Sequence, residues 1–89
     1  MRIISQSGRF DIPYENAVVY VEYESVIAKV SDERYVMGKY STEEKAIKAT
    51  EMLRELYLKY STSTNNRNFY EFFDNPKVYK FPQDEEIEV

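Results

Sequence analysis

The stretch Ser41-Thr42-Glu43-Glu44-Lys45-Ala46, followed by apolar residues every three or four positions, decides the fold of this chain. It matches a capping box, in which the Ser41 hydroxyl accepts the amide proton of Glu44 and the Glu44 carboxylate accepts that of Ser41. These two residues are therefore predicted to cap a helix that runs from Thr42 to about Tyr60. Its apolar stripe comprises Ala46, Ala49, Thr50, Leu53, Leu56, Tyr57 and Tyr60.

Short strands are predicted before this helix. Each candidate is bounded by polar or turn-forming residues, and the last three are rich in β-branched and aromatic residues. Gly8 can supply the positive φ of the first turn, and Glu24-Ser25 and Ser31–Glu33 are the predicted later turns. Such short connections favour antiparallel neighbours. The predicted strands are Arg2–Ser5, Arg9–Ile12, Ala17–Tyr23, Val26–Val30 and Arg34–Tyr40.

After the helix, Ser61–Asn68 is predicted to be a polar loop and Val78–Phe81 a final strand. The whole pattern predicts an α+β fold. It is an antiparallel β-meander of four to five strands, with one long helix packed on a face and a C-terminal aromatic segment or strand completing the core. Residues 1–83 form one predicted domain, and residues 84–89 are predicted to be a flexible acidic tail.

Composition excludes several classes of site. The 89 residues include no histidine and no cysteine, which removes the commonest general base, the commonest metal ligand and any disulfide. No cofactor and no metal site are predicted. The net charge of −4 equals that of four acids near the end, Asp84, Glu85, Glu86 and Glu88, so the rest of the chain is formally neutral. Nucleic-acid binding is disfavoured, because a basic stripe is missing.

No apolar stretch of the chain has the length of a signal sequence or a membrane span. The sequence therefore predicts a cytoplasmic protein of the host cell, with no membrane partner. No catalytic motif is recognised and no catalytic residue is predicted. The carboxylate pairs Glu22/Glu24 and Asp32/Glu33 are interpreted as solvated hairpin ends.

Four aromatics within five residues form the candidate interaction segment, Phe69, Tyr70, Phe72 and Phe73. So dense an apolar stretch is expected to be covered, either by its own domain or by a second protomer. Tyrosines in predicted strands and in the helix are interpreted as core residues, namely Tyr20, Tyr35, Tyr40, Tyr57 and Tyr60.

The segments Met1–Gln6, Asp11–Glu15 and Gly38–Ala46 resemble a group of small uncharacterised proteins of low-GC Gram-positive bacteria and their phages and prophages. The resemblance implies a mobile-element setting and assigns no catalytic residue or ligand. We expect a non-enzymatic protein-interaction module with an unknown protein partner, and homo-oligomerisation stays open. The alternatives are a small enzyme that uses carboxylate, lysine and tyrosine chemistry in a surface cleft, and an acidic protein that mimics nucleic acid.

Overall fold

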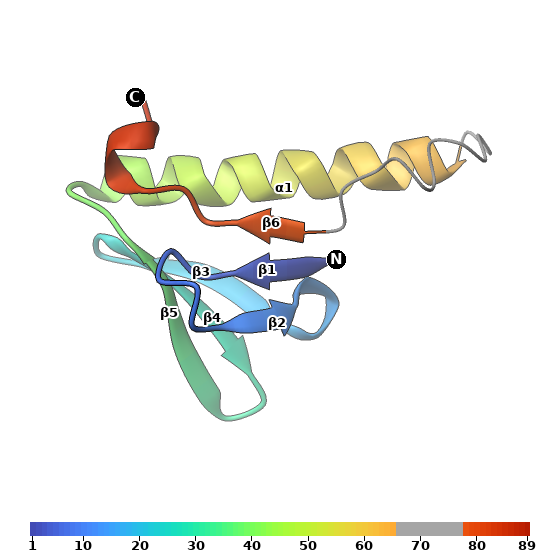
Figure 1. Cartoon of the computed structure of the whole chain (residues 1–89), viewed down its shortest axis with the longest axis horizontal. Coiled ribbons are helices and arrows are strands. Elements are labelled where there is room, and N and C mark those ends of the chain that lie inside the picture. Colours follow the sequence, from blue (N-terminus) through green and yellow to red (C-terminus); the bar gives the residue numbers. More distant parts are fainter. Residues whose placement is uncertain (66–77) are drawn as a thin grey trace.

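Two three-stranded sheets and one long helix make up the fold of the described residues (Figure 1). A computed structural model describes residues 1–65 and 78–89, with residues 60–65 described by their backbone alone. The elements in chain order are β1 (Arg2–Ile4), β2 (Asp11–Pro13), η1 (Tyr14–Asn16), β3 (Val18–Glu22), β4 (Ser25–Val30), β5 (Glu33–Lys39), α1 (Glu43–Asn65), β6 (Val78–Lys80) and η2 (Asp84–Glu86).

The α+β class is confirmed, but the single meander of four to five strands is wrong. Only β3, β4 and β5 form a meander, which we call the meander sheet. The strands β2, β1 and β6 form a second sheet, in which β1 pairs antiparallel with β2 and parallel with β6, and which we call the mixed sheet. The short helix η1 separates β2 from β3, so the chain changes direction before the meander starts. The free side of β1 is then taken by a strand from the other end of the chain.

The turns agree with the sequence prediction at Gly8 and differ from it between β3 and β4. Gly8 has the predicted positive φ, +78°. The turn between β3 and β4 was predicted at Glu24-Ser25, but Ser25 already pairs with Glu22, so the two turn residues are Tyr23 and Glu24. Tyr23 adopts a φ of 57°, a left-handed conformation that bulky residues seldom take and that the sequence pattern could not reveal.

The start of α1 differs from the predicted capping box by one residue. Thr42 is the cap, because its hydroxyl accepts the amide proton of Lys45 at 3.1 Å. The amide of Ser41 donates to Oδ1 of Asp84 at 2.7 Å, rather than to Glu44. A carboxylate from the distant end of the chain therefore replaces the local one that the sequence suggested.

The end of α1 also differs from the prediction. The helix continues through Ser61–Asn65, so the first five residues of the predicted polar loop are helical. Extending a formed helix gains one hydrogen bond per residue, which lets weak helix formers be included. In the described part of the chain, no helix combines the length and the apolar composition needed to cross a membrane.

The core lies between α1 and the inner sides of both sheets. In Figure 1, α1 crosses the top of the molecule, with β6, β1 and β2 in successive rows beneath it. The rings of Phe10 and Tyr35 lie 5.0 Å apart and connect the two sheets. The buried residues that form the core cluster are Ile3, Val26, Ala28, Met37, Tyr40, Ala46, Ala49, Leu53, Tyr79, Phe81 and Ile87.

The predicted flexible tail is docked instead. Residues Asp84–Glu86 form η2 beside the first turn of α1 (Figure 1). The side chain of Ile87 is only 4% exposed and belongs to the core cluster. Lys45 donates to the main-chain oxygen of Asp84 at 3.1 Å and forms an ion pair with its carboxylate at 3.4 Å. The segment is therefore held both by the burial of Ile87 and by the contacts of Asp84 with Ser41 and Lys45.

Candidate functional site

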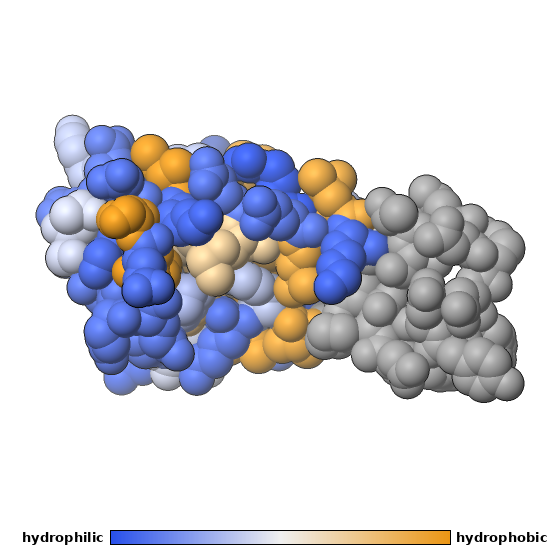
Figure 2. Space-filling view, turned by 90° about the horizontal axis from the view of Figure 1, so that it is seen from above, coloured by the Kyte–Doolittle hydropathy of each residue, from blue (hydrophilic) through white to orange (hydrophobic). Residues whose placement is uncertain are grey.

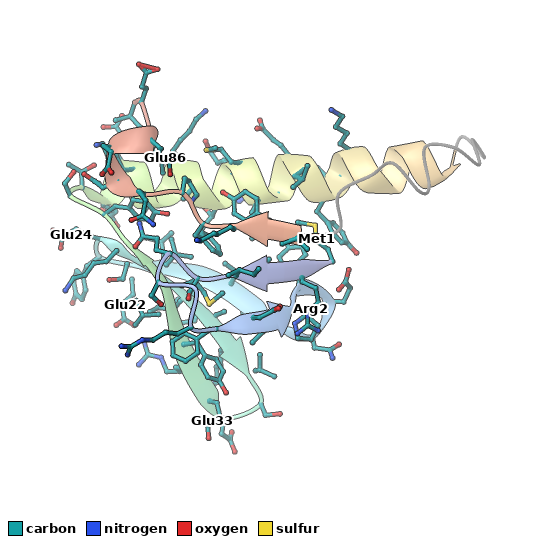
Figure 3. The ribbon with its side chains drawn as sticks, in the orientation of Figure 1. Met1, Arg2, Glu22, Glu24, Glu33 and Glu86 are labelled. Carbon is teal, nitrogen blue, oxygen red and sulfur yellow. The ribbon has the colours of Figure 1, made fainter. Side chains whose placement is uncertain are left out.

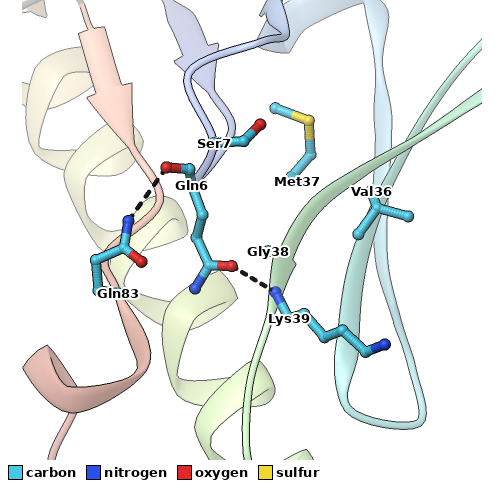
Figure 4. A pocket seen from close by; sticks show the side chains of 7 residues that line it. All are labelled: Gln6, Ser7, Val36, Met37, Gly38, Lys39 and Gln83. Carbon is cyan, nitrogen blue, oxygen red and sulfur yellow. Dashed lines mark hydrogen bonds between the residues drawn. The ribbon is translucent and has the colours of Figure 1, made fainter.

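An open hollow of about 400 Å³ lies where the two sheets and the C-terminal segment meet (Figure 4). It is lined by Gln6, Ser7, Val36, Met37, Gly38, Lys39 and Gln83. Figure 4 shows Gln6 at its centre, between the end of β5 and Gln83.

The polar groups of Gln6 are used within the protein. Its amide donates to the carbonyl of Met37 at 2.7 Å, and its side-chain Oε1 accepts from the amide of Lys39 at 2.7 Å. Its Nε2 donates to the carbonyl of Pro82 at 2.9 Å, and its own carbonyl accepts from Nε2 of Gln83 at 3.1 Å. We interpret this hollow as a joint between the sheets rather than as a ligand site.

Gly38 in the same hollow is required by packing. A Cβ there would lie 2.9 Å from the ring and the hydroxyl of Tyr40. The Tyr40 hydroxyl donates to the carbonyl of Pro82 at 2.8 Å, and burial raises the pKa of this phenol above its ordinary value. The only charged side chain in the lining is Lys39, so the hollow has no acid–base pair for proton transfer.

The outer side of the meander sheet offers a different kind of surface, which we call the sheet face. Side chains directly opposite each other on neighbouring strands share one side of a sheet, and so do alternate residues of one strand. Because Val26 and Ala28 of β4 point into the core, their neighbours point away from α1. The sheet face consists of a central row, Tyr20, Ile27 and Val36, and two flanking rows, Val18, Lys29 and Arg34 on one side and Glu22, Ser25 and Lys39 on the other.

Arg34 of β5 links to β3 across the sheet face. Its Nε donates to the Tyr20 hydroxyl at 2.9 Å, and its Nη2 pairs with Glu22 at 2.5 Å. The hydrogen bond that Arg34 donates to Tyr20 and the charge of Glu22 raise the pKa of Arg34. Since β4 lies between β5 and β3, the Arg34 side chain crosses β4, which explains why Ile27 is only 4% exposed on an outer surface.

Most of the other residues of the sheet face are exposed, apart from the half-buried Tyr20 and Ser25, and the face carries an excess of positive charge. Val18 is 64% and Val36 52% exposed. Lys29 and Lys39 are both exposed, and neither forms an ion pair with another described residue. Once Arg34 and Glu22 have paired, the face presents an apolar centre flanked by two lysines. Tyrosine and arginine, which both lie on this face, are enriched in protein interfaces.

Negative charge gathers at the start of α1 and on the docked tail. Asp84 is held there by the Ser41 amide and by Lys45, which lower the pKa of its carboxyl below the ordinary value. Figure 3 shows Glu86 beside the beginning of α1. We call this region the acidic end; its exposed acids are Glu43, Glu44, Glu85, Glu86 and Glu88, and it also exposes Ile47 and Val89.

The helix side of the molecule is less suited to a broad contact. Viewed from above α1, the surface of the described residues is mostly hydrophilic and its hydrophobic residues form separate patches (Figure 2). Among the described residues, no group of three or more histidines, cysteines or acids is arranged to hold a metal ion.

The predicted interaction residues Phe69, Tyr70, Phe72 and Phe73 lie outside the described residues. The predicted cap residues Ser41 and Glu44 do not form the expected box, as described above. Of the predicted core tyrosines, Tyr40 is buried, Tyr35 and Tyr57 are half-buried, and the side chain of Tyr60 lies outside the described part. Tyr20 lies on the sheet face, so its prediction as a core residue is wrong.

Glu22 and Glu24 lie in different surroundings. Glu22 is held by Arg34, whereas Glu24 lies in the exposed turn at the edge of the molecule (Figure 3). Val18, Tyr20 and Glu22 share one side of β3 because alternate residues of a strand do so, but the sequence does not tell which side faces the core. The role of Arg34 had no sequence signal, since it depends on the register of three strands.

Comparison of the chain with protein-family models, with curated proteins and with solved structures gives no match.

Proposed function

We propose that this chain is a non-enzymatic protein-interaction module of phage or prophage type, and that the sheet face binds its partner. The observation that carries this proposal is the row of half-buried Tyr20 and exposed Val36, with Arg34 across it and, on each side, a lysine that has no ion pair with another described residue. The partner chemistry that fits is a protein surface with aliphatic or aromatic groups beside carboxylates.

Two features favour binding over catalysis. The polar groups around the hollow at Gln6 are already hydrogen-bonded within the protein. The two phenols with raised pKa values, Tyr40 and Tyr79, donate to main-chain carbonyls, so both are engaged in packing rather than poised for proton transfer. A nucleic-acid mimic is less well supported, because the sheet face is cationic.

Selection from a display library of random peptides tests the proposal with a defined probe. Wild-type protein is the bait, and Lys29→Glu/Lys39→Glu is used for depletion. We expect recovered peptides to combine acids with aliphatic or aromatic residues. Their affinity should fall about tenfold or more on charge reversal, because like charges then face each other.

The matched control is Lys59→Glu/Lys80→Glu, which makes the same change in net charge on α1 and β6, away from the sheet face. It should bind the recovered peptides nearly as well as wild type. Failure to recover any peptide family, or equal binding by the Lys29→Glu/Lys39→Glu variant, contradicts the proposed function. Circular dichroism of each variant checks that the fold is retained.

A further inference from the structure

We infer that the occupant of the sheet face is a second copy of this chain, which docks its acidic end there in a head-to-tail contact. This inference rests on the proposed function and identifies its partner. It joins two surfaces that are both exposed in a single copy and that have opposite charge.

The charges of the two surfaces are complementary. The sheet face presents Lys29 and Lys39 without ion-pair partners among the described residues. The acidic end presents five exposed glutamates, while its aspartate, Asp84, is already paired with Lys45. Attraction between such surfaces speeds association and fixes the orientation of the partners.

The apolar groups are complementary as well. On the sheet face, Val18 and Val36 are 64% and 52% exposed. On the acidic end, Ile47 and Val89 are 44% and 62% exposed. Each surface therefore offers aliphatic side chains beside charges, and docking removes these groups from water in both copies.

A symmetric contact between two sheet faces is disfavoured. It would bring Lys29 and Lys39 of one copy against the same lysines of the other, and like charges in an interface oppose binding. A contact within one copy is also excluded, because α1 packs on the inner side of β3 and β4 and the sheet face is the opposite side. The acidic end therefore cannot contact the sheet face of its own copy, and the contact joins two copies.

A head-to-tail contact leaves one unused surface at each end of a growing chain of copies. Such heterologous association continues into a filament unless the rotation closes a ring. The expected product is therefore larger than a dimer, and its formation depends on salt, because exposed charges are screened within about 10 Å at 0.1 M ionic strength.

Sedimentation velocity over a series of protein concentrations measures this assembly directly. We expect the average mass of the wild type to rise beyond two copies at low salt and to fall back towards one copy as sodium chloride is increased. An average mass that stays at one copy at every concentration overturns the inference. A mass that stops at two copies overturns the head-to-tail geometry.

Charge-swapped variants then test which surfaces meet. The face variant is Lys29→Glu/Lys39→Glu. The end variant is Glu43→Lys/Glu44→Lys/Glu85→Lys/Glu88→Lys, whose four glutamates are exposed and have no ion pair with another described residue, and which leaves Glu86 as the one exposed glutamate of the acidic end. Each variant alone has two surfaces of the same sign and should remain a single copy. An equimolar mixture should assemble again, because each surface then meets one of opposite sign.

Restored assembly in the mixture supports the inference, and it also shows that both variants are folded. If the mixture stays dispersed while the wild type assembles, or if either variant assembles alone, the pairing of these two surfaces is wrong. The Lys59→Glu/Lys80→Glu control should assemble as the wild type does, and its failure to do so would point to net charge rather than to the sheet face.

Failure of this inference is distinguishable from failure of the proposed function. If the wild type never self-associates but binds acidic and apolar peptides through Lys29 and Lys39, the proposed function is supported and the inferred partner is wrong. If the wild type neither self-associates nor binds such peptides, both the proposed function and the inferred partner are contradicted.

Discussion

The two sheets of this molecule are built from contacts of opposite kinds. In the meander sheet each strand pairs with its neighbour in sequence through a two-residue turn, Tyr23-Glu24 or Ser31-Asp32. In the mixed sheet, β1 pairs in parallel with β6, and Ile3 lies opposite Tyr79. The comparison teaches that local patterning builds one half of the core, whereas the other half depends on a few residues from the far end of the chain.

The largest effect is expected from Phe81, which follows β6. Its side chain is 1% exposed, its amide donates to the carbonyl of Ile4 at 2.9 Å, and its ring packs edge-on against Tyr79. Phe81→Ala should lower the free energy of unfolding by about 3–5 kcal/mol, measured by urea denaturation. Val36→Ala on the exposed side of the meander sheet should change it by about 0.5 kcal/mol or less. Equal losses would mean that the two halves do not differ in this way.

Deletion of residues 84–89 should cost slightly less, about 2–4 kcal/mol, because it removes the buried Ile87. It also removes the Asp84 carboxylate from the Ser41 amide. Deletion of residues 88–89 alone is the matched control and should leave the thermal midpoint nearly unchanged. If the full deletion has the same thermal midpoint as the control, the tail is flexible, as the sequence predicted.

The joint between the sheets should have a moderate effect. Gln6→Ala leaves the amide of Lys39 without its side-chain acceptor and the carbonyl of Pro82 with the Tyr40 hydroxyl as its remaining side-chain donor, at a cost of about 1–2 kcal/mol in unfolding free energy. Gln6→Glu keeps an acceptor for Lys39 but turns a carboxylate oxygen towards the carbonyl of Pro82, and these two acceptors repel each other. It should therefore also be less stable than wild type in the same denaturation experiment, and wild-type stability of both variants would show that the joint contributes nothing.

A smaller difference in stability is expected between variants of two adjacent residues at the helix cap. Thr42→Ala removes the acceptor for the Lys45 amide and should cost about 1 kcal/mol. Ser41→Ala keeps the main-chain amide that donates to Asp84, so its loss should be smaller. The reverse order of thermal midpoints would favour the capping box that the sequence suggested.

The smallest effect is a pH dependence at Asp84. Its folded-state pKa lies below the ordinary value of 3.8, mainly through the hydrogen bond from the Ser41 amide. The stabilisation is therefore present above that pH and is lost as the pH falls through the folded-state pKa. The difference in thermal midpoint between wild type and Asp84→Asn should shrink from pH 7 to pH 2.5. A difference that stays constant would show that the Asp84 charge does not hold the tail.

The sequence predicted the elements whose cause is local. The β-branched runs of β3, β4 and β5, the positive φ of Gly8 and the apolar stripe of α1 are each visible within a few residues. The parallel pairing of β1 with β6 was missed, because Arg2–Ile4 and Val78–Lys80 are each three residues long and carry no signal of their common partner. Ile87 was missed because one isoleucine among acids resembles a solvated tail.

The candidate surface was only partly visible in the sequence. The geometry of a strand places Val18, Tyr20 and Glu22 on one side of β3, yet the side that faces solvent depends on where α1 packs. Arg34 pairs across two strands, so its position over Ile27 follows only from the register. The aromatic segment that the sequence favoured as the interaction site stays a prediction.

The parallel pairing of β1 with β6 has a consequence for synthesis on the ribosome. The meander sheet and α1 can form from residues that emerge together, because their contacts are mostly local. Gln6 must wait for Pro82, which lies 76 positions later, before the joint between the sheets can close. Until then β1 lacks the parallel strand that places Tyr79 opposite Ile3, and open strand edges in incomplete chains attract chaperones and proteases. The mixed sheet can therefore be completed only in a polypeptide that extends to β6.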